Sequence, residues 1–249
     1  MKVSVITVSY NNRETLEETI TSVSTQSYEE LEYIIVDGDS TDGTKNLIKK
    51  YEDQLSMWIS EPDEGMYDAM NKGLAMATGD LVGFLHADDF YASPDVIEQV
   101  VETLLQETAD ACYADLKYVH KSNSAKVIRT WKSGKYEPGY FFNGWMPPHP
   151  TLFVKKEIYE RYGGFKTELG TAADYELMLR LIHKHRIKLA YLPETIIKMR
   201  VGGESNSSII NRLKAHHYDR KAWKMNSLKP RFYTLWLKPL RKIGQYHWI

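Results

Sequence analysis

The sequence lacks the features from which disulfide-stabilised and membrane-spanning proteins are built. Its 249 residues include a single cysteine, Cys112, which excludes an internal disulfide and favours a reducing compartment. No apolar run approaches the roughly 20 residues that cross a bilayer as a helix. The N-terminal stretch MKVSVITVSY alternates like a β-strand and lacks the long apolar stretch of a secretion signal. These absences predict a cytoplasmic protein.

Two common ligand-binding loops are also missing. The first predicted strand is followed by SYNNRET and not by the G-x-G-x-x-G of a dinucleotide site. The loop VDGDSTDGT (36–44) fails as a calcium loop, because its twelfth position counted from Asp37 is Ile48, where glutamate is required. The many aspartates of this chain therefore need another explanation.

The first 110 residues alternate strand and helix patterns. Val3–Ser9 reads as a strand, and the short apolar run YIIVD (33–37) is typical of a strand that is buried on both faces. Further strands are predicted at 56–60 and 81–86, with helices after Asn12 and at 44–53 and 67–77. This alternation predicts an α/β fold with a doubly wound, mostly parallel sheet, flanking helices and a ligand site at the carboxyl ends of the strands.

The second half of the chain is less regular. Its patterns predict strands near 111–119, 127–131 and 151–154, and helices at 156–162 and from about 174 to 185. A domain boundary is expected near 205–211, after the polar stretch GGESNSS.

Three acid-bearing segments fall at or beyond predicted strand ends: VDGDSTDGT (36–44), EPDEG (61–65) and HADD (86–89). Parallel strands bring their carboxyl ends to one edge, so these acids should converge. No Lys or Arg lies between Asp80 and Lys117 to neutralise HADD. Convergent carboxylates suit Mg²⁺ or Mn²⁺ shared with a phosphate-bearing substrate, although any single aspartate could instead be a turn or helix-cap residue.

One enzyme alternative comes from the same residues. IIVDGDST matches the D-x-D-x-T box of haloacid-dehalogenase-type phosphatases, in which the first aspartate is the nucleophile, and HADD would then supply the later magnesium-binding acids. Only 51 residues separate Asp37 from Asp88, and a strand and a helix precede a box that normally opens that fold. A magnesium-dependent phosphohydrolase is therefore the less favoured interpretation.

Five segments, taken in order, resemble one family. They are VSVITVSYNNRETLEETITSVSTQSY, EYIIVDGDSTDGT, SEPDEGMYDAMNKGLAMATGDLVGFLHADDFY, HPTLFVKKEIYERYGGF and AADYELMLRL. Over roughly residues 1–203 the chain resembles a family 2 glycosyltransferase of the GT-A fold, in the branch that builds bacterial surface polysaccharides such as O-antigen and capsule. The resemblance implies transfer of a hexose or N-acetylhexosamine, with inversion, from a nucleotide sugar, most often a UDP-sugar, to an acceptor hydroxyl.

The resemblance also implies a donor site. HADD takes the place of the family's D-x-D motif, so Asp89 would ligate Mn²⁺ or Mg²⁺, and Asp88 would hold the ribose or support the metal. Many relatives carry a second acid after Asp37 that reads the uracil edge; this chain has Gly38, with Asp39 as the candidate substitute. For Asp68 and Lys72 the alternative is an i,i+4 ion pair. The implied nucleotide contacts are Ser9, Tyr10, Asp37, Asp39, Asp63, Asp68, Asn71, Lys72 and Asp88.

The catalytic base is expected on the acceptor side. Inversion needs a carboxylate that takes the proton of the acceptor hydroxyl, and Asp174 in TAADYELMLRL stands at the family's base position. The alternative is a helix-start aspartate favoured by the helix dipole. His86, Trp145 and His149 are candidates for sugar contacts, with core packing as an equal alternative for the latter two. Arg200 in MRVGGES (199–205) would be the cation of a loop that folds over the diphosphate.

The C-terminal segment differs in charge from the rest of the chain. Residues 212–249 contain ten Lys or Arg and one acid, Asp219, interleaved with aromatic residues. Such segments bind anionic bilayers, which suits a polyprenyl-diphosphate-linked glycan acceptor at the inner face of the plasma membrane. Nucleic acid is disfavoured because the remaining chain is acidic and has no recognition module. A solvated tail is the alternative.

The expected organisation is therefore a GT-A domain over residues 1–205, with a nucleotide-sugar-binding half (1–110) and an acceptor half (111–205). Residues 206–249 would form a basic, aromatic membrane-associating tail. A non-catalytic protein that binds a nucleotide sugar and leaves it intact is the remaining alternative, against which Asp88, Asp89 and Asp174 together argue.

Overall fold

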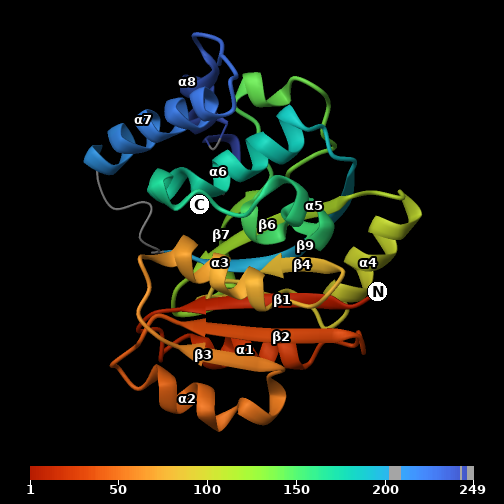
Figure 1. Ribbon diagram of the computed structural model, residues 1–249, viewed down its shortest axis with the longest axis vertical. Helices are drawn as coiled ribbons and strands as arrows, with labels where there is room; N and C mark the ends of the chain where they lie inside the picture. Colours follow the sequence, from red (N-terminus) through yellow and green to blue (C-terminus); the bar gives the residue numbers. More distant parts are fainter. Residues whose placement is uncertain (202–208, 242, 246–249) are drawn as a thin grey trace.

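The computed structural model describes residues 1–201, 209–241 and 243–245, and these residues form nine strands in one sheet (Figure 1). The sheet order is β3-β2-β1-β4-β8-β6-β9-β5, and β7 pairs with β6 beside this row. The strands are β1 Val3–Ser9, β2 Leu31–Asp37, β3 Met57–Ser60, β4 Leu81–Phe84, β5 Asp89–Tyr91, β6 Ala111–His120, β7 Asn123–Trp131, β8 Phe153–Lys155 and β9 Leu189–Arg200.

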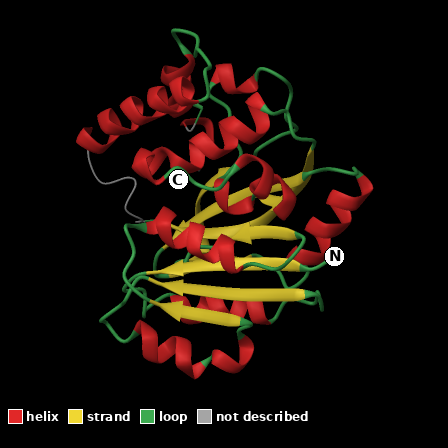
Figure 2. Cartoon of the chain, viewed as in Figure 1, coloured by secondary structure: helices red, strands yellow, loops and turns green. Residues whose placement is uncertain are grey.

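Helices cover both faces of this sheet (Figures 1 and 2). One face packs against α1, α2 and α4, and the other against α3, α5, α6 and α7. A π-helical segment, Leu179–Lys184, continues α6. The helices are α1 Leu16–Ser24, α2 Thr44–Lys50, α3 Met66–Met76, α4 Val96–Gln106, α5 Lys156–Tyr162, α6 Ala173–Met178, α7 Ile209–Met225 and α8 Thr234–Leu240.

Strand β1 shows why the sheet is buried on both sides. All seven of its residues are buried, and successive side chains point to opposite faces. Ile6 and Val8 join the cluster on the α3 side, whereas Val3 and Val5 join the cluster on the α1 side. A continuous apolar strand between two helical layers is what a parallel sheet requires.

The α/β class and the flanking helices are confirmed, but the sheet is more mixed than the sequence predicts. β1 runs parallel to β2 and β4, and β2 runs parallel to β3. β8 is antiparallel to both β4 and β6, and β5 is antiparallel to β9. β5 and β8 each have three residues, which is too short for a periodic pattern to reveal their pairing.

The C-terminal residues are not a separate tail, which corrects the expected division at residue 206. Trp223 of α7 is fully buried, and its Nε1 donates to Tyr175 Oη of α6 at 2.9 Å. Asn226 Nδ2 donates to Glu176 Oε1 at 2.9 Å. The high count of Lys and Arg in this segment concealed a buried face that packs on the acceptor half.

The outward side of this C-terminal region keeps an apolar character. Phe232, Trp236 and Leu240 are 91%, 67% and 55% exposed. Trp236 and Leu240 lie four residues apart on α8, and Phe232 lies in the turn before it. Of the helices described in the structure, none combines the length and the apolarity needed to span a membrane.

A buried carboxylate network joins the first two strands near their amino ends. Glu32 of β2 accepts hydrogen bonds from Lys2 Nζ at 2.6 Å, Ser4 Oγ at 2.6 Å and Thr78 N at 2.7 Å. Burial by itself raises the pKa of Glu32, but these donors outweigh it and lower the pKa to about 2. The ionised form therefore stabilises the junction of β1, β2 and the turn after α3.

We predict that Glu32→Gln lowers the free energy of unfolding at pH 7 by about 2–3 kcal/mol. A lowered folded pKa contributes stability above the unfolded value near 4.5, and this stability is lost as the pH falls towards about 2. Urea titrations between pH 7 and pH 2 should show the variant losing less stability over that range than the wild type. Glu29→Gln, at an exposed neighbour, is the control; equal slopes for wild type and Glu32→Gln would contradict the prediction.

Candidate active site

The carboxyl ends of the parallel strands form one edge of the sheet. β1 ends at Ser9, β2 at Asp37 and β3 at Ser60, and the register places Ser9 beside Asp37 and Asp37 beside Ser60. β4 ends at Phe84, just before the Asp88–Asp89 turn. The arrowheads of β1–β3 point to this edge (Figures 1 and 2). The three acid-bearing segments therefore follow strands that end at one edge, as their spacing predicts.

The Asp88–Asp89 turn is held through its main chain. Thr19 Oγ1 of α1 donates to the Asp89 carbonyl at 2.7 Å, and Arg200 Nη1 of β9 donates to the Asp88 carbonyl at 2.7 Å. Asp89 N donates to the His86 carbonyl at 3.0 Å. These bonds fix the backbone of the turn without engaging either carboxylate.

The carboxylate of Asp89 is buried inside the protein. Its side chain is 0% exposed, and neither carboxylate oxygen has a hydrogen-bond partner among the described residues. Burial raises the pKa of Asp89 well above its usual value, and the charge of half-buried Asp88 raises it further. The main-chain N–H and the charge of Arg200 lower this pKa, but they do not offset the burial. Burying an unpaired carboxylate is costly, and a hard divalent cation beside two carboxylates relieves that cost. The pair therefore fits Mn²⁺ or Mg²⁺.

The chain offers this cation few other ligands. Within residues 1–201, 209–241 and 243–245, no group of three or more His, Cys, Asp or Glu side chains could hold a metal ion. A cation at Asp88 and Asp89 would take its remaining ligands from water or from a substrate. Mg²⁺ is commonly bound in this way, by one or two carboxylates together with substrate phosphates.

Arg200 does not belong to a loop over the diphosphate, which corrects its predicted role. It ends β9, is 8% exposed, and its guanidinium lies 4.8 Å from the centre of the Phe90 ring. The guanidinium also pairs with Glu18 and donates to the Asp88 carbonyl. It therefore supports the turn from within the fold. Residues 202–208 of the predicted loop lie outside the described residues.

Asp37 shapes its own loop. Its buried carboxylate accepts from Ser40 N at 2.9 Å, Ser40 Oγ at 2.5 Å and Ser60 Oγ at 2.7 Å. Because both of its oxygens accept hydrogen bonds from the chain itself, Asp37 holds the ends of β2 and β3 together. These bonds favour a structural role over that of a nucleotide contact or of a phosphatase nucleophile. Asp39, the candidate substitute for a second acid, is paired with Lys45 at 2.6 Å.

Tyr10, Gly38 and Asp63 meet at the ends of β1, β2 and β3. Tyr10 is 64% exposed. A Cβ atom at Gly38 would lie 2.4 Å from Asp63 Oδ2 and 3.4 Å from Tyr10 Cδ2. Ser9 Oγ, at the end of β1, is buried without a hydrogen-bond partner among the described residues. An aromatic ring and a carboxylate are thus adjacent at the edge of the sheet.

The first turns of α3 support this cluster instead of extending it. Lys72 Nζ bonds the Pro62 carbonyl and Glu61 Oε1, both at 2.8 Å, and lies 3.6 Å from Asp68 Oδ2. The i,i+4 ion-pair alternative for Asp68 and Lys72 is therefore present. Asn71 is not the nucleotide contact that the sequence predicts. Its amide donates to the Phe165 carbonyl and accepts from Phe165 N, each at 2.9 Å, and so connects α3 to the loop that contains Phe165.

Asp174 stands half-buried in the first turn of α6. Its Oδ1 accepts from Tyr175 N at 2.6 Å, which orients the carboxylate. Tyr67, in the first turn of α3, lies against it: burial raises the pKa of the Tyr67 phenol well above its usual value, and the charge of Asp174 raises it further. The contact connects Asp174 to the helix that follows EPDEG.

Two predicted sugar contacts belong to the core. Trp145 is 3% exposed, and its Nε1 donates to the Ser133 carbonyl at 2.8 Å. His149 is buried with its ring centre 6.0 Å from that of Phe84, and burial lowers its pKa to about 3. The core-packing alternative holds for both. His86 is half-buried, 6.2 Å from His149 between ring centres, and burial lowers its pKa.

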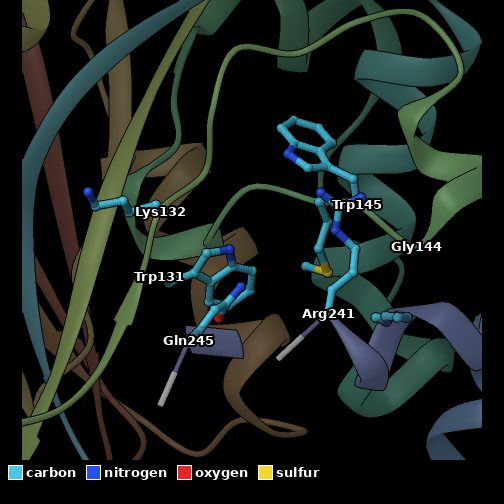
Figure 3. A pocket seen from close by; sticks show the side chains of 8 residues that line it. Trp131, Lys132, Gly144, Trp145, Arg241 and Gln245 are labelled. Atoms are coloured by element: carbon cyan, nitrogen blue, oxygen red, sulfur yellow. The ribbon is translucent and has the colours of Figure 1, made fainter. Parts of the chain in front are cut away.

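A hollow near Trp145 is too small to be a donor site (Figure 3). Its volume is about 40 Å³, and Trp145 is the only predicted site residue in its lining. The lining residues are Trp131, Lys132, Gly144, Trp145, Met146, Lys238, Arg241 and Gln245.

Comparison with known sequences bears on what this edge of the sheet does. The sequence model of glycosyl transferase family 2 matches residues 4–163. The chain belongs to this family. An uncharacterized glycosyltransferase of Mycobacterium tuberculosis, Rv1514c, is 36% identical over 180 residues, which cover 72% of this chain and 68% of the relative. A putative teichuronic acid biosynthesis glycosyltransferase of Bacillus subtilis, TuaG, is 39% identical over 109 residues, 43% of each chain.

Solved structures agree with this family 2 glycosyltransferase in fold. The mannosyltransferase PcManGT from Pyrobaculum calidifontis, in complex with GDP-Man and Mn²⁺, aligns with a TM-score of 0.68 and 20% identity over 96% of this chain and 72% of that one. S. aureus TarS 1–349, in complex with UDP-GlcNAc, aligns with a TM-score of 0.67 and 18% identity over 90% of this chain and 71% of that one. The fold is the expected GT-A fold.

Sequence reasoning missed two residues of this glycosyltransferase site, Thr19 and Tyr67. Thr19 was detectable, because it lies on the apolar face of α1 with Leu16, Ile20 and Val23, where a polar side chain needs a partner. The contact of Tyr67 with Asp174 joins residues that are far apart in the chain, so no local sequence pattern predicts it.

Proposed function

We propose that the chain transfers a sugar, with inversion, from a UDP-sugar to a glycan acceptor in the synthesis of a bacterial surface polysaccharide. The main support is the buried carboxylate of Asp89, which lies beside Asp88 at the carboxyl edge of a GT-A sheet and has no hydrogen-bond partner among the described residues. The names of two similar proteins support the substrate class, since TarS was solved with UDP-GlcNAc and TuaG is named for teichuronic acid biosynthesis.

In this proposal Asp88 and Asp89 hold the donor diphosphate through Mn²⁺ or Mg²⁺. When bound, the cation would stabilise the negative charge that develops on the nucleoside diphosphate as it leaves. The chain's own contribution is to hold the two carboxylates in place through Thr19 and Arg200, which bond the main chain of the turn. Asp88 is half-buried and Asp89 is fully buried, so Asp88 is the member of the pair that solvent reaches.

Asp174 is the proposed general base. Its carboxylate would accept the proton of the acceptor hydroxyl while that oxygen attacks the anomeric carbon from the face opposite the leaving diphosphate, which inverts the configuration. The bond from Tyr175 N to Oδ1 orients the carboxylate, and Tyr67 packs beside it. Both contacts favour one orientation before the acceptor arrives.

The exposed face of α8 is the proposed membrane contact, and it brings the enzyme to a polyprenyl-diphosphate-linked acceptor. Its exposed apolar residues are Trp236 and Leu240, together with Phe232 in the turn before the helix. The same C-terminal region carries the exposed basic residues Lys224, Lys229, Arg231 and Arg241. Aromatic residues beside cations suit the interface of an anionic bilayer. α8 lies at the end of the molecule remote from β3 in Figure 1.

The base assignment predicts that Asp174→Asn folds and binds the donor but loses transfer by about 10²–10⁴-fold, because the amide cannot take the proton. Transfer of radiolabelled sugar and thermal unfolding would be measured together. Glu168→Gln, an exposed acid just before the same helix, should keep full activity. Turnover by Asp174→Asn at the wild-type rate would refute the assignment.

The cation site predicts that Asp89→Asn is at least as stable as the wild type without metal, because neither carboxylate oxygen has a hydrogen bond to lose among the described residues. Addition of UDP with Mn²⁺ should raise the melting temperature of the wild type and not that of the variant. Asp53→Asn, at an exposed position, is the control. If Asp89→Asn shows the same rise in melting temperature as the wild type, or if EDTA does not weaken UDP binding, the cation site is contradicted.

The membrane contact predicts that combined substitution of Phe232, Trp236 and Leu240 by serine weakens binding to phosphatidylglycerol vesicles by more than about tenfold, because apolar area is lost. This variant spares Trp223, which a deletion of residues 212–249 would remove from the core. Serine at Met57 and Leu105, exposed apolar residues elsewhere, is the matched control. Cosedimentation that is equal for both variants would dismiss the contact.

A further inference from the structure

The contact between Gly38 and Asp63 is closer than any side chain at position 38 would allow. An added Cβ would lie 2.4 Å from Asp63 Oδ2, inside the distance that real Cβ atoms keep. The two residues belong to different loops, one after β2 and one after β3. A carboxylate from the second loop therefore occupies the space that a side chain of the first loop would otherwise fill.

The Asp63 carboxylate is fixed in this position. Its Oδ1 accepts from Gly65 N at 2.8 Å, which closes a tight turn where Gly65 has φ of 108°. Lys72 holds the two preceding residues in place, because its Nζ donates to the Pro62 carbonyl and forms an ion pair with Glu61. Oδ2, the oxygen turned towards Gly38, has no hydrogen-bond donor among the described residues. A fixed acceptor with a free oxygen is suited to a ligand.

The neighbour of this oxygen is the exposed ring of Tyr10. Its Cδ2 lies 3.4 Å from the same Cβ position, so the ring and the carboxylate both lie against Gly38. An aromatic face stacks a nucleobase, for about 1–3 kcal/mol per base. A carboxylate at the edge of a stacked base accepts N–H groups and repels lone pairs.

The other acids of these loops are engaged elsewhere. Asp37 is buried and bonded to Ser40 and Ser60, and Asp39 is paired with Lys45. Asp63 is thus the carboxylate that lies beside Tyr10 and has an oxygen that can accept a hydrogen bond from a ligand.

We propose that Asp63 selects the base of the donor: uracil stacks on Tyr10, and its N3–H donates to Asp63 Oδ2. Gly38 is required because a larger residue would displace that oxygen. Cytosine presents a lone pair at the same ring position, so the carboxylate disfavours it. The inference rests on the proposed function, since it assigns the base of the same nucleotide site.

The first test uses the wild-type protein and needs no variant. Isothermal titration calorimetry with Mn²⁺ would compare UDP, CDP and UDP methylated at N3. A hydrogen bond to a charged acceptor predicts that UDP binds about tenfold or more tightly than either of the others. Equal affinity for UDP and its N3-methyl analogue overturns the inference.

The second test exchanges the acceptor for an amide. Asp63→Asn keeps an oxygen for Gly65 N but can present an N–H to the base, so the preference for UDP over CDP should fall by about tenfold or reverse. Glu64→Gln, the exposed acid next in the chain, should keep the wild-type preference. An Asp63→Asn variant that retains the full preference for UDP assigns selection to another group and overturns the inference.

The results separate this inference from the function on which it rests. A wild type that binds UDP and CDP equally contradicts base selection by Asp63 and leaves a nucleotide-dependent transferase in place. A wild type that binds no uridine nucleotide contradicts both the proposed donor and the base selection.

Discussion

Taking a carboxylate out of water without giving it a donor is among the costlier arrangements in a protein. The Asp89 side chain is in this state, and much of the surrounding architecture keeps it there: the apolar end of β4 before it, Thr19 bonding its carbonyl, and Arg200 bonding the carbonyl of Asp88. Without these main-chain bonds the turn could relax and expose the acid. Stability is thus given up at one point of the sheet edge, where the proposed cation site lies.

The acids on and beside the strands divide into two groups with different tasks. Asp37 and Glu32 accept hydrogen bonds from their own chain and hold strands and loops in register. Asp63 and Asp89 each keep at least one oxygen without a donor from the described residues. The first group creates the rigid frame, and the frame keeps the second group from finding internal partners. Sequence position alone does not separate them, because all four lie on or after strands of the same sheet.

Much of the fold followed from local patterns, whereas much of the site depended on distant partners. Strands β1–β4 were predictable because a parallel sheet buried on both faces demands apolar runs between amphipathic helices, and their order placed the acids at one edge. Asn71 and Arg200 were misassigned because the groups that occupy them, Phe165 and the Asp88 carbonyl, are remote in sequence. The basic composition of the C-terminal segment likewise concealed Trp223, since a buried face of few residues is outweighed by many surface charges.

The packing of α7 on α6 affects the order in which the parts of the enzyme can form during synthesis. The residues on either side of the turn that carries Asp174 bond to Trp223 and Asn226, through Tyr175 Oη and Glu176 Oε1. The nucleotide half can be complete on the ribosome while these partners are still unsynthesised. The turn that carries the proposed general base therefore gains these bonds only after α7 has been synthesised.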